Sequence, residues 1–193
     1  MTVRQSYYMR IIVLCMVLYM PLGATCKNVQ QPQNDAVVEL PTPNRKSNVS
    51  LEKTLASRRS IRSFKDEKLA LQELGQILWA AQGITEPARK YRTAPSAGAT
   101  FPIETYVLID KVADLTPGIY HYDPNSHSIM MIHAGDFKTP LRENAARQGS
   151  ITQAPFTLIF CADFAKIRPR YKERSERYVF MELGHIAQNV HLQ

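Results

Sequence analysis

The densest group of residues that could do chemistry is the run Arg-Arg-Ser-Ile-Arg-Ser-Phe at positions 58–64. Planar guanidinium groups bind phosphate through paired hydrogen bonds, and serine hydroxyls supply further donors. Ile61 and Phe64 alternate with the basic positions and could anchor the segment. A solvated basic turn would have the same composition, so this run alone leaves both interpretations open. The residues expected to hold a phosphate are Arg58, Arg59, Ser60 and Arg62.

A second group lies in the segment 91–102, Tyr-Arg-Thr-Ala-Pro-Ser-Ala-Gly-Ala-Thr-Phe-Pro. Small residues between two prolines allow the backbone to approach a flat ligand closely. The hydroxyl of Ser96 can also donate a hydrogen bond. The alternative is an ordinary Pro/Gly loop before a strand. The residues expected to line a flat ligand are Pro95, Ser96, Ala97 and Gly98.

Composition excludes several other classes of function. The five histidines show no metal-ligand spacing and no Cys-x-x-Cys pair occurs, so no metal site is expected. The net charge of +7 comes from 24 basic and 17 acidic side chains without a long Lys/Arg tract, so nucleic acid is not an expected partner. With 45% hydrophobic and 21% charged residues, the 193-residue chain has the composition of a folded domain.

The N-terminal residues resemble a targeting segment rather than part of a folded domain. Two arginines precede an apolar run, Ile11–Met20, and small residues follow it. This order is typical of a secretory signal, and the run is shorter than the roughly 20 residues that a membrane span needs. We therefore expect residues 1–26 to be a signal peptide or N-terminal anchor. The chain would be exported as a periplasmic, secreted or membrane-anchored protein, and Cys26 could carry a lipid.

The rest of the chain divides into a linker and one α+β domain. Residues 27–49 are rich in Pro, Gln and Asn and read as a linker, although the apolar patch 36–40 could lie as an edge strand. Residues 50–193 form the domain. Hydrophobic spacing predicts helices beginning at 51 and over 70–82, 140–148 and 178–192, and strands within 101–110, 118–125, 128–133 and 156–162. Gly83 is expected to end the second helix.

The two motifs, taken together, resemble the FMN-dependent nitroreductase family. An Arg-Arg-Ser-x-Arg-x-Phe element precedes an Ala-Pro-Ser-Ala-Gly-Ala-x-x-Pro loop, and residues 74–84 look like the helix that joins them in that family. Residues 117–124 and 178–193 are similar to the branch called SagB-type dehydrogenases. The resemblance covers residues 37–193, with the motifs in the family's order.

The resemblance implies a nitroreductase-like fold: a central antiparallel sheet flanked by helices, in a homodimer with FMN at the interface. The arginine motif, residues 58–62, would hold the FMN phosphate and ribityl chain. Residues 95–98 would line the flavin ring from the other subunit. A reduced nicotinamide, NAD(P)H, would deliver hydride to the flavin, and a small organic substrate would then take its place.

The SagB branch also implies one candidate catalytic residue. Members that oxidise azoline rings use a Lys-Tyr pair, and the comparable residues here are Arg170 and Tyr171. Arginine is a poor proton acceptor because its pKa exceeds about 12, which disfavours azoline oxidation. Tyr171 is therefore a candidate for proton transfer, and a packed aromatic ring is its alternative.

The C-terminal end leaves two functions open. The sequence stops at 191–193 inside a helical pattern without a stop signal, so we expect a truncated chain; the alternative is a helix that docks and ends there. Family members continue with a glycine-containing loop that contacts the flavin, so the FMN-binding domain would be incomplete. The first hypothesis is an FMN-dependent oxidoreductase, and the second is a non-catalytic remnant or interaction module.

Overall fold

The computed structural model describes residues 12–14, 37–144 and 148–193, which form one main sheet and one small sheet. The main sheet has the strand order β1-β8-β5-β6-β7-β2. All neighbouring strands in it are antiparallel except β1 and β8, which are parallel. The strands of the main sheet are β1 (Ile12–Leu14), β2 (Val37–Glu39), β5 (Ile103–Ile109), β6 (Gly118–Asp123), β7 (Ser128–Ala134) and β8 (Phe156–Ala162). Those of the small sheet are β3 (Ile84–Glu86) and β4 (Tyr91–Arg92).

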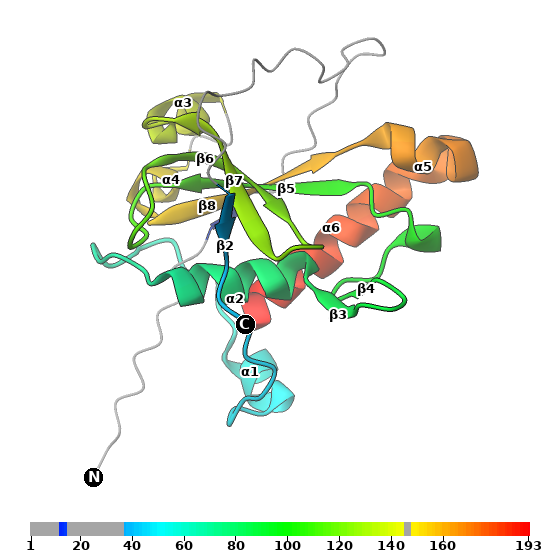
Figure 1. The fold of residues 1–193 in the computed structure, drawn as a ribbon, viewed down its shortest axis with the longest axis horizontal. Helices are drawn as coiled ribbons and strands as arrows, with labels where there is room; N and C mark the ends of the chain where they lie inside the picture. Colours follow the sequence, from blue (N-terminus) through cyan, green and yellow to red (C-terminus); the bar gives the residue numbers. More distant parts are fainter. Residues whose placement is uncertain (1–11, 15–36, 145–147) are drawn as a thin grey trace.

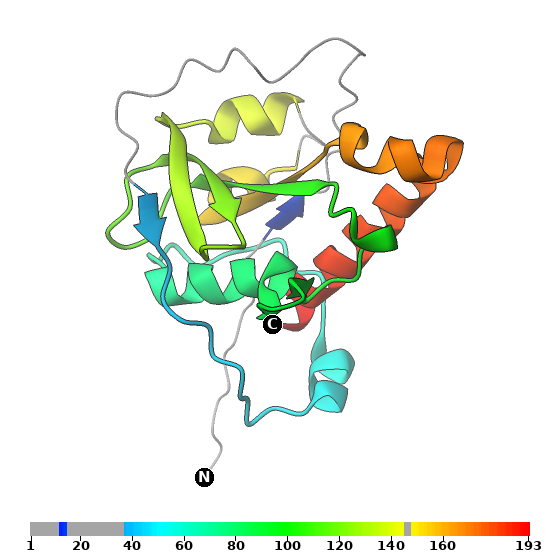
Figure 2. The same cartoon turned by 45° about the vertical axis from the view of Figure 1, so that its right-hand side comes forward.

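Helices lie on both sides of the main sheet. Figures 1 and 2 show α2 (Leu71–Gln82) and α6 (Ser175–Leu192) against one face and α3 (Lys138–Asn144) on the other. This arrangement confirms the predicted fold class, α+β with a central antiparallel sheet flanked by helices. The remaining helices are α1 (Leu51–Ser57), α4 (Ser150–Gln153) and α5 (Phe164–Tyr171), with the 3-10 turns η2 (Ala97–Ala99) and η3 (Lys172–Arg174).

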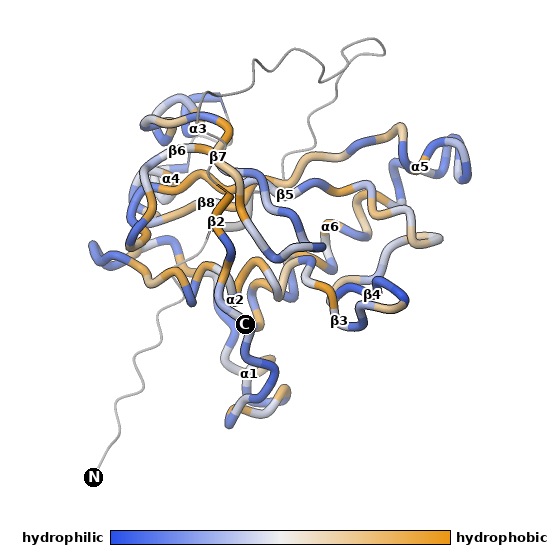
Figure 3. The backbone as a smooth tube through the Cα atoms, in the orientation of Figure 1, coloured by the Kyte–Doolittle hydropathy of each residue, from blue (hydrophilic) through white to orange (hydrophobic). Residues whose placement is uncertain are grey.

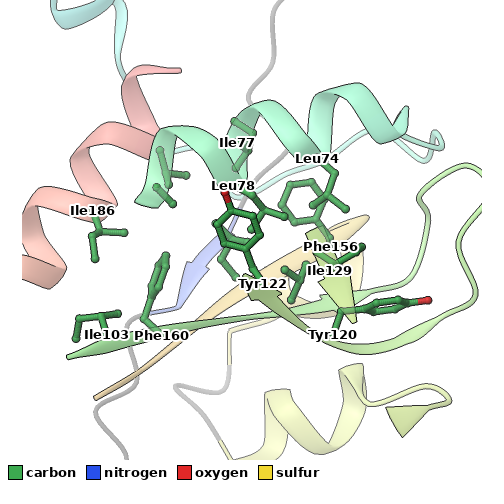
Figure 4. Packing of buried hydrophobic residues seen from close by; sticks show 14 of the residues in the cluster. Leu74, Ile77, Leu78, Ile103, Tyr120, Tyr122, Ile129, Phe156, Phe160 and Ile186 are labelled. Carbon is green, nitrogen blue, oxygen red and sulfur yellow. The ribbon is translucent and has the colours of Figure 1, made fainter. Parts of the chain in front are cut away.

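The core forms where the apolar faces of α2 and α6 meet the sheet (Figure 4). Residues three or four positions apart share a helix face, which is why the predicted spacing places them together. Figure 3 shows apolar residues concentrated in the strands and along α2, with a more hydrophilic surface around α5. The buried side chains with this spacing are Leu74, Ile77, Leu78 and Ala81 on α2, and Val179, Leu183, Ile186 and Val190 on α6.

Part of the predicted linker belongs to the sheet. Val37–Glu39 forms β2 and pairs with β7, with Val38 opposite Ile129, so the edge-strand alternative is confirmed there. The predicted signal peptide or anchor, residues 1–26, lies outside the described residues apart from Ile12–Leu14, whose backbone pairs with β8. Export therefore stays a prediction. Within the described ranges, no helix combines the length and the apolar character needed to cross a bilayer.

Two helices differ from their prediction for local reasons. The helix expected over 140–148 begins at Lys138 instead, because the Asp136 carboxylate accepts a hydrogen bond from the Lys138 N–H at 3.0 Å. Its last described residue is Asn144. Sequence periodicity missed α5, which is short, basic and contains Pro169. Asp163 starts that helix by accepting a hydrogen bond from the Ala165 N–H at 2.9 Å.

Gly83 ends α2 as predicted, but for a different reason. Its φ of −62° is one that any residue can adopt, so no left-handed turn demands glycine. The requirement is space: a Cβ at Gly83 would lie 2.1 Å from Cδ1 of Trp79 and 2.7 Å from the Trp79 carbonyl oxygen. The Gly83 carbonyl also accepts a hydrogen bond from the Thr93 N–H at 3.0 Å, which ties α2 to the segment that leads into β5.

Replacing Gly83 with alanine is expected to destabilise the protein by about 1–3 kcal/mol, because the indole of Trp79 must move out of a packed position. Urea unfolding measures the change. Gly149→Ala is the matched control, since beyond its chain neighbours no atom of a described residue lies within 4 Å of a Cβ there, and its φ of −62° is ordinary. A Gly83→Ala variant as stable as the Gly149→Ala variant would contradict the close packing.

Candidate functional site

The segment Pro95–Gly98, called here the Pro95 loop, lies between β4 and β5 and is ordered by hydrogen bonds. The Ser96 Oγ accepts a hydrogen bond from the Phe101 N–H at 2.9 Å. Just before the loop, Asn189 of α6 donates its Nδ2 to the Thr93 carbonyl at 3.0 Å. These contacts fix the path of the backbone without help from a ligand.

The bare backbone of Gly98 faces two side chains of α5. Gly98 has a φ of +58°, a conformation that favours glycine. A Cβ at Gly98 would lie 2.7 Å from the Tyr171 hydroxyl and 2.7 Å from Cζ of Arg170. The Arg170 Nη1 donates a hydrogen bond to the Gly98 carbonyl at 3.0 Å. The structure thus brings the predicted catalytic residue, Tyr171, to the Pro95 loop.

The ring and the hydroxyl of Tyr171 have different surroundings. Its ring packs edge-on against Tyr178 of α6, with 4.6 Å between the ring centroids. Its hydroxyl lies at the Gly98 backbone, where a ligand of the loop would be within its reach. The packed-aromatic alternative therefore describes the ring and leaves the hydroxyl available, so the proton-transfer role stays a prediction.

Glu182 of α6 approaches the same loop, although the sequence analysis did not select it. The residue is only 3% exposed, and its Oε2 has no hydrogen-bond partner among the described residues. Burial raises the pKa of Glu182 to about 7, while the Ser96 hydroxyl and the charge of Arg92 act in the opposite direction. Its spacing from Val179 and Ile186 places an acidic residue on an apolar helix face, and that anomaly was visible in the sequence.

Arg92 was also missed by sequence analysis, and it adds a half-buried cation beside the loop. Its guanidinium lies over the ring of Phe101, 4.2 Å from the centroid, and donates a hydrogen bond to Gln82 Oε1. Burial lowers the pKa of Arg92, and the negative charges of Glu104 and Glu182 raise it. Because arginine remains protonated despite such shifts, Arg92 is a permanent positive charge there.

A polar cavity of about 140 Å³ lies beside Arg92. Glu104 of β5 lines it, with His121 Nε2 2.9 Å from its Oε2 and the Lys166 ammonium on its Oε1. Hydrogen bonding to His121, with that to Lys166, lowers the pKa of Glu104 to about 2, although burial acts in the opposite direction. Glu104 therefore joins β5, β6 and α5 as an ionised carboxylate.

The arginine motif lies elsewhere in the fold, after α1. The segment 58–64 is irregular rather than a strand, and Phe64 anchors it by packing on Ile151 and Ala154. Arg59 donates a hydrogen bond from its Nη1 to the Ala56 carbonyl at 3.0 Å. Arg59, Ser60 and Arg62 are exposed, and Arg58 is half-buried. Within the described part of the chain, no ion pair involves these arginines.

The two predicted halves of the site do not meet in one copy of the chain. Arg58 lies near His191. Burial is the main cause that lowers the pKa of His191, and the positive charge of Arg58 lowers it to a smaller extent. Ser96 instead lies at Glu182, nine residues earlier on α6. Because a helix rises about 1.5 Å per residue, the two motifs are separated by about 13 Å along this helix.

A larger cavity of about 390 Å³, lined by Arg45, Trp79 and the β6–β7 turn among others, contains none of the predicted site residues. Among the described residues, no three His, Cys, Asp or Glu side chains gather closely enough to hold a metal ion.

Comparison with known proteins gives a consistent result. The family model for the nitroreductase family matches residues 55–193. The chain is 42% identical over 144 residues to the nitroreductase-like protein MJ1384 of Methanocaldococcus jannaschii, covering 75% of this chain and 72% of that protein. It is 28% identical over 127 residues to the microcin B17-processing protein McbC of Escherichia coli, covering 63% of this chain and 47% of McbC.

The fold has a counterpart among solved structures. A nitroreductase-like protein of Ralstonia eutropha superimposes with a TM-score of 0.69 and 30% sequence identity, covering 81% of this chain and 70% of that one. The strand that carries Glu104 and the helix that carries Glu182 both lie within the residues matched by the family model.

Substituting Glu104 with glutamine is expected to lower the free energy of unfolding by about 1–2 kcal/mol at pH 7, since a charge-assisted bridge between three elements is lost. The pKa of Glu104 is lower folded than unfolded, so its stabilisation is present above about pH 4.5 and is lost as the pH falls towards 2. Urea unfolding at pH 7 and pH 3 measures this. The exposed Glu176→Gln is the control, and an equal loss at both pH values would refute the ionic origin.

Proposed function

The chain belongs to the nitroreductase family, a family of flavin-type oxidoreductases, and we propose that it is an FMN-dependent member that transfers hydride to or from a small organic substrate. The similarity to McbC supports the SagB-like branch. FMN, when bound, would supply the chemistry of accepting and donating hydride, with NAD(P)H as the proposed reductant. The protein's own residues would bind and orient the FMN and would supply protons.

The observation that carries this proposal is that Gly98 lets two side chains of α5 approach the loop that carries Ser96. The left-handed glycine has no Cβ, and the Tyr171 hydroxyl and the Arg170 guanidinium occupy the space that one would fill. Ser96 brings a hydroxyl from the loop, and Tyr171 brings another from α5 to the same backbone. This combination fits a planar, hydrogen-bonding ligand, with the Tyr171 hydroxyl holding a proton close to it.

The chemistry of the donor set at positions 58–62 fits the other end of FMN. Three guanidinium groups and a serine hydroxyl can neutralise and hydrogen-bond a phosphate dianion. Arg59, Ser60 and Arg62 are exposed, and within the described residues no ion pair involves the three arginines, which leaves them available for such a ligand. The anchoring of Phe64 on α4 would hold the segment in place.

A homodimer would bring the two halves together. As the family resemblance implies, the phosphate group and the ring of one FMN would then contact different subunits. Large apolar side chains that are at least half exposed support an interface on these helices. They are Leu51 (61%) and Leu55 (50%) on α1, and Phe180 (51%) and Met181 (53%) on α6.

The test of the proposal is the flavin absorbance of the purified 193-residue chain after incubation with FMN and removal of unbound flavin. Stoichiometric FMN, reduced on addition of NAD(P)H, is the expected result. A chain that retains no flavin from a saturating solution would favour the alternative of a non-catalytic module.

Arg62→Ala is expected to weaken FMN binding by about 10–100-fold, because one charge-assisted phosphate contact is worth about 1.5–3 kcal/mol. Riboflavin, which lacks the phosphate, should bind the variant and the unmodified chain equally. Fluorescence titration with both flavins measures the difference. Arg142→Ala, an exposed arginine on α3, is the matched control. Equal weakening of riboflavin binding would show that Arg62 acts through the fold instead.

Phe180→Glu is expected to raise the dimer dissociation constant by at least about 100-fold, since each copy would lose an apolar contact and bury a charge. Sedimentation velocity measures the change, and FMN binding should fall in parallel because the site is shared. Arg142→Glu, on the opposite side of the sheet, controls for added negative charge. Full flavin binding by a monomeric variant would contradict the shared site.

A further inference from the structure

The carboxyl group of Glu182 is buried against the Pro95 loop without a full set of partners. The residue is 3% exposed, and no described residue forms a hydrogen bond to its Oε2. Burying a carboxyl group with an unpaired oxygen costs free energy, so its presence calls for an explanation. The neighbour on the loop is Ser96, whose hydroxyl lowers the pKa of this carboxyl.

The surroundings of Glu182 are mixed in charge. Arg92 of β4 is the cation that acts on it, but the guanidinium hydrogen-bonds Gln82 rather than the carboxyl. Arg92 is in turn shared with acidic groups of the sheet, so Glu182 is only partly compensated. The titratable groups around this set are Glu104 on β5, Tyr122 and Asp123 on β6, Arg170 and Tyr171 on α5, and Tyr178 on α6.

We propose that Glu182 is a positioning residue of the flavin site: by holding or losing a proton, its carboxyl group sets whether the Ser96 hydroxyl presents a hydrogen-bond donor or an acceptor to the bound flavin. This inference rests on the proposed function, because it assumes that FMN lies on the Pro95 loop.

The hydrogen-bond valence of Ser96 explains how one proton makes this choice. A serine hydroxyl has one hydrogen and two lone pairs, and the Phe101 N–H already occupies one lone pair. An ionised Glu182 can only accept, so it takes the Ser96 hydrogen and leaves a lone pair for the ligand. A protonated Glu182 donates into that lone pair instead, and the Ser96 hydrogen then becomes available to the ligand.

The position of the equilibrium suits this role. Burial raises the pKa of Glu182 to about 7, so both protonation states are populated near neutral pH. Oxidised FMN offers several acceptor atoms, and these favour a neutral Glu182 with the Ser96 hydrogen directed outward. FMN should therefore bind more tightly below pH 7 than above it.

The first measurement uses the unmodified chain without flavin. The backbone amide resonance of Phe101, whose N–H donates to Ser96, is followed by NMR from pH 5.5 to pH 8.5. We expect a titration with a midpoint near pH 7 that is absent in Glu182→Gln and unchanged in the exposed Glu176→Gln. A resonance of the unmodified chain that does not move over this range overturns the inference without need of any variant.

The second measurement is FMN affinity at pH 6 and pH 8.5, expressed as the ratio between the unmodified chain and Glu182→Gln. This ratio cancels the titration of the FMN phosphate. We expect the unmodified chain to weaken relative to the variant by about 5–10-fold as the pH rises. In a Ser96→Ala background the change should fall below about 2-fold.

The outcomes separate the possibilities. A pH effect that persists undiminished in Ser96→Ala would mean direct charge repulsion by Glu182 and would overturn the positioning role. A flat affinity ratio beside a titrating Phe101 amide would overturn the link to the cofactor. No FMN binding at any pH would overturn the proposed function and the cofactor half of this inference, while the Phe101 titration still decides whether Glu182 controls Ser96.

Discussion

The burial of one face of α6 is the constraint on which the arrangement of the site depends. Four apolar side chains of this helix enter the core beside α2. Once that face is fixed, the directions of the other side chains on the helix are fixed as well. Glu182 must point to the Pro95 loop, Asn189 must reach the Thr93 carbonyl, and His191 must lie near Arg58. The helix thus sets the distance between the two motifs.

The charged groups around the Pro95 loop differ in how completely they are paired. Glu104 has two partners and is held ionised, which favours rigid joining of the strands to α5. Glu182 and Arg92 lie close enough to influence each other, but Arg92 donates its hydrogen bond to Gln82. Buried groups that are satisfied rigidify a fold, whereas groups left partly unsatisfied respond to protons and ligands. The two carboxylates therefore have opposite characters, although one positive charge acts on both.

Sequence reasoning predicted the elements with strong periodicity and missed features that depend on tertiary contacts. The spacing of Leu74 and Leu78 predicted α2 because an amphipathic helix shows its buried face in the sequence. It missed α5, since a short basic helix with Pro169 has no such pattern and depends on the Asp163 cap. Local motifs likewise identified the Pro95 loop, while the place of Arg92 depends on its tertiary contacts with Gln82 and Phe101.

The edge of the sheet at β2 has a consequence for the protein in solution. This strand is only three residues long, and Pro41 and Pro43 follow it shortly afterwards. Proline lacks the amide hydrogen that a further strand would need, so this edge has few backbone groups that can pair with a strand of another molecule. An uncovered β7 would expose a longer row of amides and carbonyls and invite edge-to-edge aggregation. The short strand and its prolines thus limit self-association of the protein through this edge of the sheet.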